Sequence, residues 1–240
     1  MLLSTVRHEP PTRRTSPRPV VPMTTDPGLE WRFRALASPW PLMGEVAAAA
    51  GAVARSHQRV LAAASAVRAE VESEDWDRKP AGDIEILSIE QVDALWVAVA
   101  DMLTWVRTVE DRTSRQHGGK ELGLLATLPA GKERNRVDQA LQEYRAAGAG
   151  EARRWAAESL HVMSVPAAIS PAIVVWSDQR PHLTFPFPDE AGSRADAQRE
   201  PGGSYHFTDG RDAVDVANKL MTATETFMSR VLGSMPRTEP

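Results

Sequence analysis

Several residue types that do chemistry in proteins occur in this chain, but the common motifs built from them each lack a required residue. The chain has no cysteine, which excludes disulfides, thiolate nucleophiles and cysteine-ligated metal sites. A lysine follows two glycines in His117-Gly118-Gly119-Lys120-Glu121, as in a phosphate-binding loop. However, that loop needs Ser or Thr at Glu121 and Gly at Ser114. Zinc-protease, acyl-hydrolase and dinucleotide-binding motifs are also missing from the sequence.

A second group of residues has side chains that ligate metals. His182 and His206 flank a polar stretch that carries Asp189, Glu190 and Asp196, so imidazole and carboxylate ligands would converge if this stretch folded back. Their spacing is irregular, and surface-loop residues explain them equally well. We therefore predict no metal and no cofactor.

Basic residues are concentrated in the second half of the chain, although the net charge is -4. The basic residues in question are Lys132, Arg134, Arg136, Arg145, Arg153 and Arg154. They can form a local anion-binding surface within an acidic protein, or they can be the solvated faces of helices. The paired carboxylates Glu110 and Asp111 fall at a predicted helix end, where solvated acids are common.

Arg154 and His161 are separated by six residues, on a predicted helix that precedes the last one. This arrangement resembles the signature of prokaryotic HEPN domains. These are usually dimeric helical bundles, and many are metal-independent ribonucleases of toxin or defence systems. The resemblance covers residues 42–233 by helix order. It implies that His161 transfers a proton at a ribose hydroxyl or a leaving oxygen, and that Arg154 neutralises the phosphate of an RNA substrate.

Helix geometry sets a condition on this pair of residues. Seven residues apart on one helix, Arg154 and His161 share a face but lie about 10 Å apart along the axis. They can meet one phosphate only if the helix breaks before His161 or a second subunit supplies one of them. The alternative is that both residues lie at the edge of a helix whose Trp155 and Leu160 fill the core.

The elements that position these residues are predicted to be helices, because apolar residues recur every three or four positions. Helices are expected over 29–37, 42–72, 88–114, 132–163 and 211–232, with a short helical segment over 120–128 and a break near Gly148 and Gly150. Residues 73–87 read as a polar connection. Thr208 or Asp209 is expected to cap the last helix.

Two further features affect the packing of these helices. In the helix over 42–72 the valines at 46, 53, 60 and 67 are spaced by seven, which predicts a seam within the bundle or an intermolecular coiled coil. The β-branched and aromatic residues over 172–187 predict a hairpin, which Pro181 and Pro186 confine to an edge. A mobile loop is expected over 188–207.

These elements predict a mainly α fold, an up-and-down bundle of about five helices with a small β-hairpin inserted before the C-terminal helix. A single domain is expected over 29–235. Residues 1–28 hold six of the 18 prolines and four arginines, and are expected to be a disordered tail, with Met23 as an alternative start. We find no export signal and no apolar stretch of about 20 residues, so we expect a cytoplasmic protein without membrane contact.

The function predicted from sequence is a non-catalytic interaction or regulatory module. It would bind a protein partner or a second copy through the Val46–Val67 face or around Trp105, which lies a quarter-turn off the apolar stripe of its helix. The alternative is the HEPN-like ribonuclease that uses Arg154 and His161, and RNA is a partner only in that case.

Overall fold

The computed structural model describes residues 26–73, 84–87, 90–162, 172–177, 180–187 and 210–236. Its helices are α1 (Pro27–Leu36), α2 (Met43–Ser73), α3 (Glu90–Thr113), α4 (Leu124–Thr127), α5 (Lys132–Tyr144), α6 (Gly150–Val162) and α9 (Ala213–Ser234), and the kinked segment η1 (Arg145–Ala149) joins α5 to α6. Its strands are β1 (Ile84–Leu87), β2 (Arg115–His117), β3 (Lys120–Leu122), β4 (Ala172–Ser177) and β5 (Arg180–Thr184). The predictions for residues 1–25 and for the loop over 188–207 fall outside the described residues.

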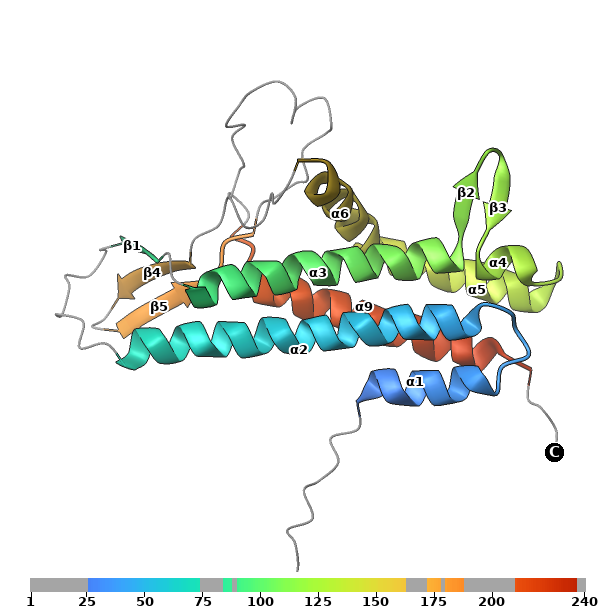
Figure 1. The fold of residues 1–240 in the computed structure, drawn as a ribbon, viewed down its shortest axis with the longest axis horizontal. Helices are drawn as coiled ribbons and strands as arrows, with labels where there is room; N and C mark the ends of the chain where they lie inside the picture. Colours follow the sequence, from blue (N-terminus) through green and yellow to red (C-terminus); the bar gives the residue numbers. More distant parts are fainter. Residues whose placement is uncertain are drawn as a thin grey trace, which may run out of the picture.

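The fold is mainly α, as the apolar periodicity predicts. The long helices α2, α3 and α9 run side by side, with α1 lying along α2 (Figure 1). In addition, α5 packs against α9, and α6 packs against α3 while projecting from the bundle. No helix in the described ranges is long and apolar enough to cross a membrane.

The valine stripe of α2 lies inside the bundle. Val46, Val53, Val60 and Val67 are all fully buried within a single chain, and α2 packs against α1, α3 and α9. The seam is therefore intramolecular. The hypothesis that the Val46–Val67 face binds a partner is wrong, because the chain's own helices cover it.

The apolar stripe of α3 is also confirmed. The eight positions that recur at intervals of three and four are at most 3% exposed: Val92, Leu95, Trp96, Val99, Met102, Leu103, Val106 and Val109. Burying such a stripe is the main source of stability for a helix in water. Trp105 lies outside the stripe and stays 38% exposed.

The first helix begins earlier than predicted. Asp26 accepts a hydrogen bond from the Gly28 amide at 2.9 Å and caps α1, and Pro27 stands at a first-turn position that suits proline. The predicted boundary at residue 29 is therefore two residues late. A Cβ atom at Gly28 would lie 2.7 Å from the Gly51 Cα atom, so α1 approaches α2 too closely for any side chain there.

A three-stranded antiparallel sheet, ordered β1-β4-β5, lies at one end of the bundle (Figure 1). The predicted hairpin is its β4–β5 part, in which Ser177 pairs with Arg180, and Pro181 lies on the edge strand as expected. The prediction of a polar connection over 73–87 was wrong for residues 84–87, which form β1. There β1 pairs with β4, with Ile84 opposite Val175.

A second small hairpin follows α3. Gly118 and Gly119 have φ angles of 56° and 76°, the left-handed region that a two-residue hairpin turn requires, and His117 pairs with Lys120 across it. The helical segment predicted over 120–128 is therefore reduced to the single turn α4.

The C-terminal helix α9 has a different cap from the one predicted. Asp212 accepts hydrogen bonds from the Val214 amide and from the Phe185 amide, both at 2.8 Å. Asp212 therefore caps α9 and also fixes the segment that leaves β5. Phe187 in that segment is buried and contacts Trp155 edge-on at 5.4 Å.

Candidate functional site

The backbone is kinked between α5 and α6. There, within η1, Gly148 leaves the helical conformation with a φ of 127°. The sequence predicted a break near Gly148 and Gly150, and Gly148 is the residue that makes it. The kink sets the direction in which α6 leaves α5, and so decides which side chains of the two helices meet.

The kink brings two arginines to one buried carboxylate. Arg145 Nε and Arg153 Nη1 each donate a hydrogen bond of 2.8 Å to the same Glu110 Oε1 atom. The Glu110 side chain is only 4% exposed, whereas those of Arg145 and Arg153 are 33% and 40% exposed. One buried oxygen therefore holds two like-charged guanidinium groups side by side at the surface.

Two neighbouring residues of α3 extend this cluster. Asp111 forms ion pairs with Arg153 at 3.2 Å and with Arg107 at 3.6 Å. Within the described residues, Arg107 Nη1 and Glu110 Oε2 are buried without a hydrogen-bond partner. We call these five residues, Arg107, Glu110, Asp111, Arg145 and Arg153, the arginine cluster. It carries three positive and two negative formal charges.

Tyr144 lies beneath the cluster, in the last turn of α5. Its hydroxyl is 3.2 Å from Thr224 Oγ1, and its ring packs on Phe227 with centroids 4.9 Å apart. Burial raises the pKa of the Tyr144 hydroxyl well above its ordinary value, and the nearby Glu110 charge adds to this effect. Tyr144 therefore acts as a neutral, packed core residue.

The structure separates the two residues singled out by the HEPN resemblance. Arg154 is exposed on α6, and α6 continues without a break from Gly150 to Val162. His161 therefore stays about two turns, or about 10 Å, further along the same helix. The side chain of His161 is not among those that the structure describes. Trp155, between them in sequence, is buried as the structural alternative predicted.

The remaining candidate residues are dispersed. Arg134 forms an ion pair with Glu121 away from the cluster, and His182 is exposed on β5. His206 and the three acids of the predicted metal stretch fall outside the described residues. In the part of the chain that is described, no three histidines or carboxylates lie close enough to hold a metal ion.

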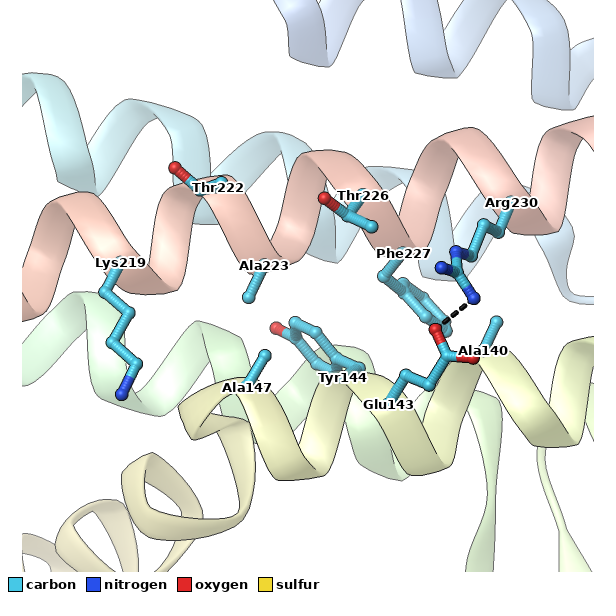
Figure 2. A pocket seen from close by; sticks show the side chains of 10 residues that line it. All are labelled: Ala140, Glu143, Tyr144, Ala147, Lys219, Thr222, Ala223, Thr226, Phe227 and Arg230. Atoms are coloured by element: carbon cyan, nitrogen blue, oxygen red, sulfur yellow. Dashed lines mark ion pairs between the residues drawn. The ribbon is translucent and has the colours of Figure 1, made fainter.

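A groove of about 400 Å³ runs between α5 and α9 (Figure 2). Its residues are Ala140, Glu143, Tyr144, Ala147, Lys219, Thr222, Ala223, Thr226, Phe227 and Arg230. Alanines and the two buried rings form its floor, and the Glu143–Arg230 ion pair lies at the opposite end from Lys219. The hydroxyl of Tyr144, a buried polar group among the described residues that line the groove, already pairs with Thr224.

The outer face of α1 is the largest run of exposed apolar side chains among the described residues. Leu29, Phe33 and Leu36 are 50%, 66% and 82% exposed. They follow one another at intervals of four and three, so they share one face, while Trp31 and Ala35 on the opposite face are buried. Val97 and Trp105 on α3 are exposed as well, but eight residues apart.

The position of Glu110 at a predicted helix end favours a solvated acid, but Glu110 is buried, because Arg145 and Arg153 compensate its charge. The signal available in the sequence is its spacing, four residues after the buried Val106 and next to Val109, at the edge of the apolar stripe of α3.

No family model, no curated protein and no solved structure matches this chain. Evidence on function therefore comes from the described side chains themselves.

Proposed function

We propose that this protein is a non-catalytic interaction module that binds an amphipathic helix of a partner protein through the outer face of α1. The observation that carries the proposal is the exposed stripe of Leu29, Phe33 and Leu36. Exposed apolar area costs about 25 cal/mol per Å², and three large side chains aligned on one helix are typical of a helix-binding face. Single exposed apolar residues, by contrast, are ordinary.

Charge around the stripe favours an acidic partner. Arg32 and Arg34 are exposed on α1, against one exposed acid, Glu30. Glu30 and Arg34 are 3.9 Å apart, and both are largely solvated, so this pair adds little stability. A partner helix with apolar residues at intervals of three and four and acidic flanks would match this face.

Site-specific photo-crosslinking tests the proposal. A photoreactive residue at position 33, in the full chain and in cells, is expected to yield one specific adduct with another protein. The same residue at position 97 is the control, because Val97 is an isolated exposed apolar residue on α3. The double variant Leu29→Ser, Leu36→Ser should abolish the adduct without lowering the melting temperature.

The proposal fails if position 33 crosslinks no more specifically than position 97. An adduct between two copies of this chain would show that the α1 face binds a second copy, not the helix of another protein. Sedimentation of the purified protein over a concentration series distinguishes these two outcomes.

A HEPN-like, metal-independent ribonuclease remains the second candidate, favoured by the exposure of Arg154 on α6 beside the arginine cluster. Because α6 is unbroken, Arg154 and His161 would have to act on one phosphate across two copies. Toxicity on expression that Arg154→Ala or His161→Ala relieves, and Arg134→Ala does not, would support it. An inert wild-type protein would exclude it.

A further inference from the structure

We infer that the arginine cluster binds a single phosphate group of a small phosphorylated ligand, on the exposed side of Arg145 and Arg153. The inference is independent of the α1 face. Arg145 uses Nε and Arg153 uses Nη1 to bind Glu110. Within the described residues, their other guanidinium nitrogens make no hydrogen bond. Each guanidinium has five N–H donors, so most of the donors remain available.

The charge arrangement leaves the outer side of the cluster uncompensated. Glu110 is 4% exposed and lies beneath the two guanidinium groups. Asp111 compensates Arg107 and Arg153 from the α3 side. Three arginines against two acids leave one positive charge in excess, and the exposed Arg154 follows directly on α6. An anion on the solvent side would relieve the repulsion between the two adjacent guanidinium groups.

Phosphate is the anion class that this geometry suits. A planar guanidinium donates two parallel hydrogen bonds to phosphate oxygens, and two such groups side by side can share one tetrahedral anion. The chain carries a net charge of -4, and such a protein has no general field that attracts a long polyanion. A small phosphorylated molecule is therefore favoured over nucleic acid.

The fixed positions of the two guanidinium groups distinguish the cluster from an ordinary solvated pair. On a straight helix, Arg145 and Arg153 would start about 12 Å apart along the axis. The kink at Gly148 brings their side chains together, and both bind the same oxygen of Glu110. Glu110 is thus a positioning residue, and the two arginines are the binding residues.

Calorimetric titration of the full chain with phenyl phosphate, inorganic phosphate and adenosine monophosphate tests the site. We expect saturable binding of phenyl phosphate that Arg145→Gln or Arg153→Gln weakens at least about tenfold, which corresponds to about 1.4 kcal/mol. Arg134→Gln is the matched control. The Arg134 side chain is 35% exposed and pairs with one carboxylate, so its loss should change the affinity less than about twofold. Arg153→Lys keeps the positive charge but loses the planar guanidinium group, so its affinity for phenyl phosphate should lie between those of the wild type and Arg153→Gln.

A second measurement keeps the test valid if a variant folds poorly. Phenylglyoxal modifies exposed arginines, and phosphate should protect Arg145 and Arg153 of the wild-type chain, but not Arg134, when modified peptides are counted by mass spectrometry. Equal protection at all three, or no saturable binding, would overturn the inference. Tighter binding of a short RNA than of all three small ligands, lost in the same variants, would overturn the choice of a small ligand. Preference for inorganic phosphate over the two esters would identify free phosphate as the ligand.

Discussion

Replacing Glu110 with glutamine is the most informative single perturbation of the cluster. The amide keeps the shape of the side chain and one acceptor oxygen but removes the buried negative charge. Hydrogen bonds to charged groups contribute about 1.5–3 kcal/mol when buried. Here the two arginines are 33% and 40% exposed, and solvent can take over part of their charge. We therefore expect Glu110→Gln to lower the free energy of unfolding by about 2 kcal/mol in total.

Thermal unfolding followed by circular dichroism measures this loss. For a domain of this size, about 2 kcal/mol corresponds to a fall of about 4–8 °C in melting temperature. Glu121→Gln is the matched control, because Glu121 accepts a hydrogen bond from a single arginine, Arg134, and is 25% exposed. Its loss should cost less than about 1 kcal/mol.

Salt provides a further check. Because Glu110 is buried, most of the difference in melting temperature between the wild type and Glu110→Gln should persist in about 1 M salt. The reasoning is refuted if Glu110→Gln melts at the same temperature as Glu121→Gln. It is also refuted if Glu110→Gln is more stable than the wild-type chain. The free-energy cost of burying the charge would then exceed the stabilisation from its two arginines.

Three further outcomes follow from other contacts. Asp212→Ala should cost about 1–2 kcal/mol in denaturant unfolding, because it removes the α9 cap and the acceptor of the Phe185 amide; an unchanged midpoint would contradict this. Gly148→Ala should destabilise by more than about 1 kcal/mol, since its φ of 127° disfavours a side chain and the new Cβ would lie 3.4 Å from Leu220 Cδ2; a more stable variant would show that the kink relaxes freely. The raised pKa of Tyr144 means that the unfolded chain loses this proton first, so stability should fall as pH rises above about 10. Tyr144→Phe should flatten that fall by up to about 1.4 kcal/mol per pH unit, measured as unfolding free energy against pH.

The parts of the fold that the sequence predicts are those that depend on local spacing. Val92, Val99 and Val106 recur at intervals that place them on one helix face, whatever the rest of the chain does. Strand β1 does not have this property. Ile84 to Leu87 alternate over only four residues, and the strand exists because β4, about ninety residues later, pairs with it.

The same reasoning applies to the candidate site. The basic residues of the second half are visible in the sequence, and so is the glycine that interrupts their helix. The convergence of Arg145 and Arg153 on Glu110 is not visible, because it joins positions 35 and 43 residues apart. It also depends on the direction in which α6 leaves the kink. Tertiary geometry, not residue type, therefore decides which of the arginines share a counter-charge.

The pairing of β1 with β4 also affects how the chain is made. During synthesis, Ile84–Leu87 leaves the ribosome long before its partner strand Ala172–Ser177 exists, so its backbone has no ladder partner for about ninety residues. The helical hairpin of α2 and α3 can close in that interval, because its contacts are close in sequence. The sheet can therefore form only after β4 has been made, and it joins the early and late halves of the polypeptide. Backbone amides of β1 should exchange with solvent deuterium ahead of those in the buried turns of α3.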